Sequence, residues 1–157
     1  MITTWERLSH KHIPELYRVA CVSEPYIPKV NILEFESAMS MRDGFVFKIG
    51  DEIIGATTLS DYMPGVDAVM HVFINPEVHG RWINRELLRV TFDLPFNVLK
   101  LPRVSSYHIP GLTDAAAKFQ TNLGFTIEGR KRKAFLHDGN LMDVVLVGML
   151  REECVWA

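Results

Sequence analysis

The sequence has little cysteine, no long apolar run and no strong excess of either charge. Its 157 residues contain two cysteines, Cys21 and Cys154, whose separation matches no metal-ligand spacing. We therefore expect neither a disulfide framework nor a metal site, and the thiols suit a reducing compartment. No window approaches the roughly 18 apolar residues of a membrane span, and residues 1–12 lack the apolar segment of a secretory signal. These absences predict a cytoplasmic protein without membrane contact.

Basic residues are not in excess either. The chain has 17 Lys and Arg against 19 Asp and Glu, a formal net charge of −2. A domain that binds nucleic acid normally shows a basic surplus, so no nucleic-acid partner is expected. One basic run covers residues 130–133, and we interpret it as the solvated face of a strand rather than a binding patch.

Linkers, repeats and low-complexity segments are also missing. With 48% apolar and 23% charged residues, the composition is that of a globular protein, and residues 1–157 are interpreted as a single domain. Ser60, Ser105 and Ser106 stand outside any Gly-x-Ser-x-Gly pattern, so the sequence gives no support to hydrolase chemistry.

Hydrophobic periodicity predicts the order of the elements. They are a short strand at 2–7, a helix capped by Ser9, a helix at 32–41, strands at 45–49, 53–59 and 68–74, a helix from His79 to Leu94, a strand at 103–108, a helix at 114–123, and strands at 126–136 and 141–150. Pro95 lacks an amide hydrogen and predicts a kink or helix end near Leu94. The strand-helix-strand order between residues 68 and 108 implies one parallel pair in an otherwise antiparallel sheet. The predicted fold class is α/β, an α+β mixed sheet.

Residues 74–88 form the first of two more informative segments. A strand ends at Asn75-Pro76, and Val78-His79-Gly80-Arg81-Trp82-Ile83-Asn84 is expected to open a helix. The free amide hydrogens and positive dipole end of a helix N-terminus favour a bound diphosphate. Gly80 would permit close approach, and Arg81 and Arg85 would add positive charge. The alternative interpretation is a glycine required only by the geometry of the turn.

The second segment lies near the C-terminus. It combines Ala116-Ala117-Lys118-Phe119, Leu123-Gly124-Phe125, Glu128-Gly129-Arg130 and a closing strand at 143–150. Together with the element order, the two segments resemble the GNAT superfamily of acyl-CoA N-acyltransferases, and more narrowly its ribosomal-protein N-terminal acetyltransferase branch (RimJ/RimL-like). The resemblance covers residues 69–153.

The loop of the first segment departs from the common GNAT pattern. His79 stands where Arg or Gln is usual, Trp82 replaces the middle glycine, and Asn84 replaces the final Gly or Ala. The His-Gly-Arg-Trp version is similar to one in small GNAT-like proteins of bacteria and phages. The bulk of Trp82 limits how closely a coenzyme can approach the backbone.

The resemblance implies a central, mostly antiparallel sheet with a splayed parallel pair, flanked by about four helices. It also implies acetyl-CoA as cosubstrate, with pantetheine lying along the strand at 68–74 like an additional strand and a backbone amide stabilising the oxyanion. The acceptor would be a primary amine of a small molecule, a peptide N-terminus or a lysine, attacking directly in a ternary complex. Many members of the superfamily dimerise through sheet edges, so the resemblance also suggests a homodimer here. The cofactor-binding positions implied are Phe73, Ile74, Val78, His79, Gly80, Arg81, Trp82, Ile83, Asn84, Thr113 and Lys118.

Acid–base catalysis requires side chains that take and return protons. The attacking amine must lose a proton, and His71 is the first choice of base, ahead of Asp67, Glu34 and Glu36. The alternative is that His71 is a hydrogen-bonded structural residue of an apolar strand. In the superfamily a tyrosine often protonates the thiolate, and its position here corresponds to Gln120.

Tyr107 and His108 are therefore the candidate acids, since an amide side chain cannot donate a proton in this way. The missing tyrosine and the altered loop leave one alternative function open, a binding or interaction protein that keeps the scaffold without turnover. Transfer of a longer acyl group is the other alternative.

Overall fold

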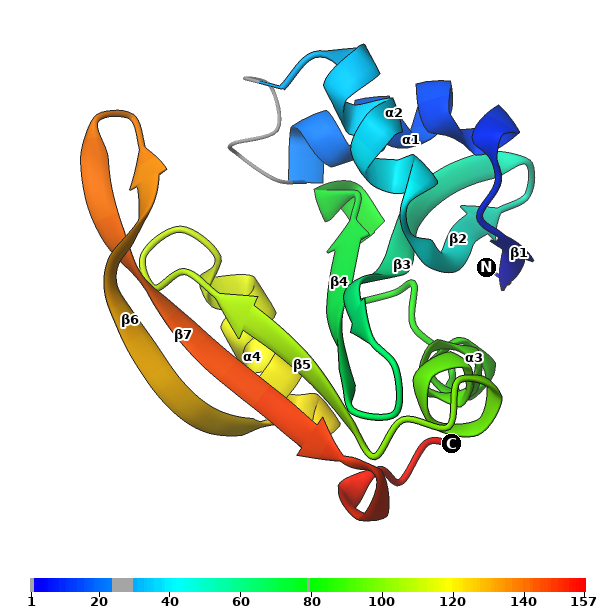
Figure 1. The fold of residues 1–157 in the computed structure, drawn as a ribbon. Coiled ribbons are helices and arrows are strands. Elements are labelled where there is room, and N and C mark those ends of the chain that lie inside the picture. Colours follow the sequence, from blue (N-terminus) through cyan, green and yellow to red (C-terminus); the bar gives the residue numbers. More distant parts are fainter. Residues whose placement is uncertain (1, 24–29, 79) are drawn as a thin grey trace.

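The computed structural model describes residues 2–23, 30–78 and 80–157. Its strands form one sheet in the order β1-β2-β3-β4-β5-β7-β6. The strands are β1 Thr3–Arg7, β2 Asp43–Ile49, β3 Glu52–Met63, β4 Asp67–Ile74, β5 Arg103–His108, β6 Thr126–His137 and β7 Asn140–Leu150. The α-helices are α1 Ile13–Ser23, α2 Ile32–Ser40, α3 Arg85–Asp93 and α4 Asp114–Leu123 (Figure 1). Short helical turns are η1 His10–His12, η3 Pro76–Val78, η4 Leu94–Val98 and η5 Arg151–Glu153.

Neighbouring strands pair antiparallel except for β4 and β5, which are parallel. The exception arises because the chain passes through α3 between these two strands, a crossover that returns it in the same direction. This confirms the predicted mixed sheet. The parallel pair has a single register position, Val69 opposite Ser105, and the two strands then separate (Figure 1).

The helices cover the two faces of the sheet in pairs. Ile13, Leu16 and Phe35 of α1 and α2 share a buried cluster with Phe73 of β4, and this side is called the α1/α2 face. On the other side, Met70 packs in a cluster with side chains of α3 and α4, which defines the α3/α4 face. Because successive side chains of a strand point to opposite faces, odd-numbered residues of β4 belong to the α1/α2 face.

The prediction of a helix from His79 was wrong at its start, because α3 begins at Arg85. Asn84 is the N-cap, and its Oδ1 accepts a hydrogen bond from the Leu87 amide at 2.9 Å. A capping side chain satisfies an amide that has no partner inside the helix, and so fixes the helix start there. The end agrees with the prediction: α3 gives way at Leu94 to the π-helical turn η4, which contains Pro95.

The other predicted elements are confirmed, with shifted ends. Gly124 closes α4 in the left-handed conformation (φ +104°), as a C′ glycine does. Strand β3 runs four residues beyond its predicted end at Leu59, through a bulge between Ser60 and Met63. Pro25 and Pro28, which separate the first two predicted helices, lie outside the described residues.

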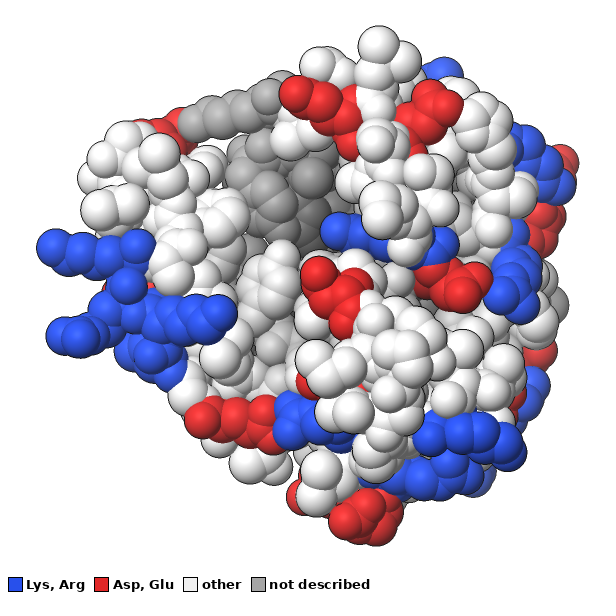
Figure 2. Space-filling view, in the orientation of Figure 1, with Lys and Arg blue, Asp and Glu red and all other residues white. Residues whose placement is uncertain are grey.

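The basic run lies on β6 and is exposed, as predicted. The run contains Arg130, Lys131, Arg132 and Lys133. Asp143 of β7 stabilises a bulge between Lys131 and Phe135 of this strand. Its carboxylate accepts a hydrogen bond from the Lys133 amide at 2.9 Å and forms an ion pair with Arg130 at 2.8 Å. These contacts lower the pKa of Asp143. Positively charged side chains gather at this edge of the molecule in Figure 2.

Candidate functional site

The site is organised around the split between β4 and β5. Beyond Val69 and Ser105 no further backbone register position joins the two strands within the described residues. A side chain bridges the next step, where Ser106 Oγ donates to the Met70 carbonyl oxygen at 2.8 Å. The rest of β4, up to Ile74, therefore has a strand partner on its β3 side only. An extended ligand can bind such a strand edge through main-chain hydrogen bonds.

His71 and Tyr107 meet across this split on the α1/α2 face. Their ring centroids lie 5.7 Å apart, with the planes at 82°. His71 Nε2 lies 2.8 Å from Ser60 Oγ of β3. Burial, and to a smaller extent the positive charge of Arg42, lower the pKa of His71 to about 4, while Asp61 acts in the opposite direction. The imidazole is consequently neutral at pH 7.

His108 points away from His71, although the preceding residue, Tyr107, contacts His71. Adjacent residues of a strand face opposite sides, so His108 lies on the α3/α4 face, where its Nδ1 is 2.9 Å from Gln120 Oε1. The structure thus separates the three predicted catalytic residues into one pair and one single histidine.

Gln120, which the resemblance places at the position of the superfamily tyrosine, is 7% exposed and organises this second face. Its Nε2 donates to the Tyr107 carbonyl oxygen at 2.8 Å and to Ser106 Oγ at 3.1 Å. The amide oxygen therefore faces His108, whose Nδ1 must carry the hydrogen of this bond. Sequence reasoning excluded Gln120 as an acid and missed this role, since its partners are at least 12 residues away along the chain.

The predicted diphosphate loop is a turn and not the first turn of a helix. The Arg81 amide donates to the Val78 carbonyl oxygen at 3.1 Å, and the Arg81 guanidinium donates to the Glu77 carbonyl oxygen at 2.8 Å. Gly80 is exposed and adopts φ +77°, a conformation that favours glycine. His79 lies outside the described residues. The amide of Arg81 is therefore already hydrogen-bonded, contrary to the expectation of free donors along the whole loop.

Trp82 fixes this loop to the body of the protein. Only 7% exposed, its indole stacks on Phe47 of β2 with centroids 5.4 Å apart and contacts Phe119 of α4 at 5.7 Å. Val78 and Ile83 pack partly buried against the same cluster. Trp82, which the resemblance places at the middle glycine, is thus a core side chain that joins the sheet to α4.

The N-terminus of α3 carries mixed charge. Arg85 is exposed there, whereas the carboxylate of Glu86 accepts a hydrogen bond from Trp5 Nε1 at 3.2 Å. Asn84 Nδ2 donates to the Thr3 carbonyl oxygen at 3.3 Å. A carboxylate in the first turn stabilises the helix dipole but repels a second anion. A diphosphate would have to bind on the side of Arg81 and Arg85.

The remaining cofactor candidates differ in accessibility. Phe73 and Ile74 are buried on opposite faces of β4. Thr113 Oγ1 accepts from the Ile109 amide at 2.7 Å, so its hydroxyl stabilises the turn before α4. Lys118 is exposed on α4.

The alternative bases have structural partners. Asp67 Oδ2 accepts from Ser105 Oγ at 2.5 Å and lies 3.2 Å from Arg103 Nε, while its Oδ1 accepts from the Ala68 amide at 2.9 Å. Glu34 Oε2 accepts from the Asn31 amide at 3.0 Å and completes the capping box of α2. These contacts assign both carboxylates a structural role.

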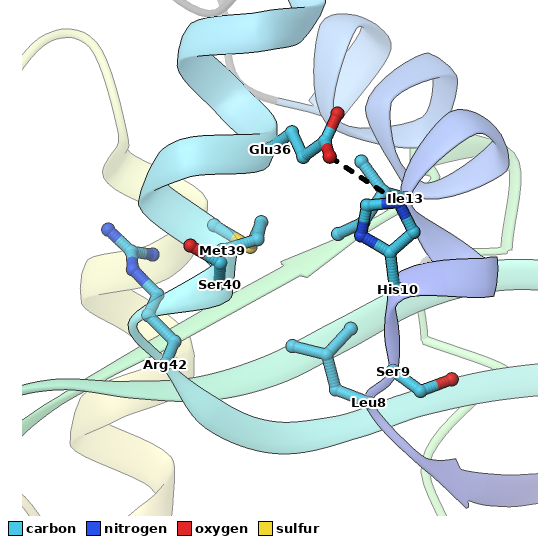
Figure 3. A pocket seen from close by; sticks show the side chains of 8 residues that line it. All are labelled: Leu8, Ser9, His10, Ile13, Glu36, Met39, Ser40 and Arg42. Atoms are coloured by element: carbon cyan, nitrogen blue, oxygen red, sulfur yellow. Dashed lines mark ion pairs between the residues drawn. The ribbon is translucent and has the colours of Figure 1, made fainter.

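Glu36, the last of these candidates, lines a cavity between η1, α1, α2 and Arg42, which lies just before β2. The cavity has a volume of about 240 Å³. Figure 3 shows Glu36 and His10 facing each other on one side, 3.4 Å apart, with Arg42 on the other. Arg42 Nη1 also donates to Thr58 Oγ1 at 3.3 Å, and Thr58 is the cross-strand neighbour of His71. Arg42 therefore links the cavity to the surroundings of His71.

Two further observations concern metals and membranes. Among residues 2–23, 30–78 and 80–157, no three side chains of His, Cys, Asp or Glu are grouped so that they could hold a metal ion. Within the same ranges, no helix combines the length and apolar character needed to cross a bilayer.

The split sheet and its helix layers define the GNAT fold, and comparison with solved structures agrees. One similar structure is a chimera of the spermidine N-acetyltransferase SpeG from Vibrio cholerae and hSSAT, with a TM-score of 0.78, 20% identity and 96% of each chain covered. A variant of the Vibrio cholerae SpeG enzyme has a TM-score of 0.77 at 17% identity, with 95% of each chain covered. A protein described as a candidate phosphinothricin N-acetyltransferase reaches 0.80 at 13% identity, covering 95% of this chain and 98% of its own.

These likenesses show the fold of the chain. No family model and no curated protein matches the sequence.

Proposed function

We propose that the protein is a GNAT-type N-acetyltransferase that moves an acetyl group from acetyl-CoA to a primary amine. The observation that supports this most directly is the split after Val69 and Ser105, with His71 and Tyr107 in contact across it. The split offers a free strand edge for the amide groups of pantetheine, and the two side chains offer proton-transfer groups beside it.

In the proposed reaction the amine nitrogen bonds to the thioester carbonyl carbon and the carbon–sulfur bond then breaks. A backbone amide of β4 stabilises the oxyanion, and neutral His71 takes the proton that nitrogen loses as the bond forms. The departing sulfur takes a proton from Tyr107 or from His108, which flank the split on opposite faces. The diphosphate is assigned to the loop and the pantetheine to β4, with contacts at Phe73, Ile74, Val78, His79, Gly80, Arg81, Trp82, Ile83, Asn84, Thr113 and Lys118.

The acceptor is assigned to the α1/α2 face, because His71 and the cavity of Figure 3 both lie there. A small molecule, a peptide N-terminus and a lysine are all candidates within the class of primary amines. The same proposal includes three finer points. The protein belongs to the ribosomal-protein N-terminal acetyltransferase branch, it is cytoplasmic, and it forms a homodimer that binds no nucleic acid.

Acetyl-CoA binding and amine-dependent thiol release test this function together. Acetyl-CoA should raise the melting temperature, and free thiol should accumulate with the correct amine from a panel of polyamines, amino acids and short peptides. Propionyl-CoA and longer acyl-CoAs serve as comparison, since transfer of a longer chain would show a larger thermal shift with them. Absence of any shift at millimolar acetyl-CoA would refute the proposal.

A second candidate is a binding protein that keeps the scaffold without turnover. The buried Trp82 favours it, because the indole occupies the middle-glycine position where the superfamily brings its backbone close to the coenzyme. The same thermal-shift experiment separates the two, since this candidate predicts no response to any acyl-CoA.

A further inference from the structure

A bulge in β3 places two polar residues beside His71. The register with β4 shifts between Ser60 and Met63, and Asp61 adopts φ +49°, which is uncommon for a residue other than glycine. Bulges insert extra residues into one strand and redirect their side chains. Here the result is a chain of contacts in which Ser60 Oγ lies 2.8 Å from Asp61 Oδ2 and 2.8 Å from His71 Nε2.

Counting protons determines which way each hydrogen bond runs. A serine hydroxyl has one hydrogen, and the carboxylate of Asp61 can only accept, so Ser60 donates to Asp61. The Ser60 oxygen must then accept from His71, which requires the hydrogen of the neutral ring to be on Nε2. The lone pair of the ring is consequently on Nδ1.

We propose that Ser60 and Asp61 are positioning residues that hold His71 as the Nε2–H tautomer and so present Nδ1 as the proton acceptor. This inference rests on the proposed function, in which His71 takes the proton of the amine. As nitrogen bonds to the acetyl carbon, its proton moves to Nδ1 and an imidazolium forms. The Nε2–H remains bonded to Ser60, and the negative charge of Asp61 offsets the new positive charge.

The charged and titratable groups around His71 come from three elements. Arg42, just before β2, disfavours the imidazolium, and Asp61 of β3 favours it. Tyr107 of β5 meets the ring edge-on. Asp61 is thus the group among these three that compensates a proton on His71, and the bulge is what brings it close.

The test combines spectroscopy with kinetics. Nitrogen-15 NMR of the histidine side chains should show His71 as Nε2–H at pH 7, and Ser60→Ala should give a mixture of tautomers. The Ser60→Ala variant should lose roughly 10- to 100-fold in kcat with an unchanged KM for acetyl-CoA. Ser60→Thr, which keeps the hydroxyl, should recover the wild-type tautomer and most of the rate. Asp61→Asn, which tolerates the same backbone conformation, should lower kcat without changing the fold.

A double variant identifies the route of the effect. In a His71→Ala background, Ser60→Ala should cause no further loss, because residues that act through one group are not additive. An Nδ1–H ring in the wild type, or a Ser60→Ala variant with unchanged tautomer and kcat, would overturn the positioning role. A wild-type protein with the Nε2–H ring but no acetyl transfer to any amine would instead overturn the proposed function, and the catalytic use of the positioning with it.

Discussion

Replacing Trp82 by alanine should destabilise the protein more than any change at an exposed tryptophan. The indole is 7% exposed and has aromatic contacts on two sides, with Phe47 at 5.4 Å and Phe119 at 5.7 Å. Truncating a buried tryptophan costs about 3–5 kcal/mol, of which each aromatic pair contributes about 0.5–1.5 kcal/mol. For a chain of this size the melting temperature falls by about 2–4 °C per kcal/mol. The expected decrease is therefore roughly 6–20 °C.

Equilibrium unfolding in urea, followed by far-ultraviolet circular dichroism, measures this loss without depending on tryptophan fluorescence. Trp82→Phe is the first control and should lose less than half as much, because a ring remains between β2 and α4. Trp5→Ala is the second, since Trp5 is 37% exposed and should lose less as well. A loss below about 1 kcal/mol for Trp82→Ala would contradict the inference that the indole joins the sheet to α4.

Three further predictions concern charge. Gly80→Asp should weaken acetyl-CoA binding by roughly tenfold or more in calorimetry, because its carboxylate would repel the diphosphate. Gly80→Asn, which fits the same φ of +77°, should keep an affinity within about threefold of the wild type. Equal affinities of the two variants would show that the loop does not bind the diphosphate. Arg42→Met should raise the pKa of His71 above about 4, towards its ordinary 6.5, in an NMR titration. The wild type should also lose stability as the pH falls from 6.5 to about 4, because the unfolded ring takes a proton first, and the variant should lose less over this range. The pKa of Glu6 is lowered to about 2, mainly by the hydrogen bond from Lys48. Glu6→Gln should therefore lower the free energy of unfolding above pH 4.5, and the difference from the wild type should fade as the pH drops towards 2.

The element order could be predicted from the sequence because periodicity and turn residues are local signals. The step from alternating to helical spacing after Ile74, and the Asp138-Gly139 turn, each lie within a few residues of the element they define. The helix predicted from His79 starts too early because a glycine such as Gly80 is as common in the turn before a helix as at its opening. Asn84 is itself a common N-cap residue, and it was the signal that could have given the correct start.

The network at Gln120 could not be predicted in the same way. Its amide bonds to Ser106, Tyr107 and His108, which the chain brings near only after β5 and α4 have packed together. The sequence suggested Tyr107 and His108 as candidate acids, and strand alternation already implies that they face opposite sides. Which of the two meets His71 depends on the register of β4 and β5, and one register position sets it.

Position 120, where the resemblance to the GNAT superfamily implies an acid, holds a glutamine that does more than leave a group out. A glutamine amide both donates and accepts, so it fixes the Tyr107 carbonyl and the His108 ring at once. Gln120 engages Nδ1 of His108 on the α3/α4 face, away from His71. Tyr107 shares a face with His71, and its ring lies edge-on to the imidazole. We therefore expect Tyr107 to be the proton donor of the proposed reaction, while Gln120 holds His108 in a fixed orientation on the opposite face.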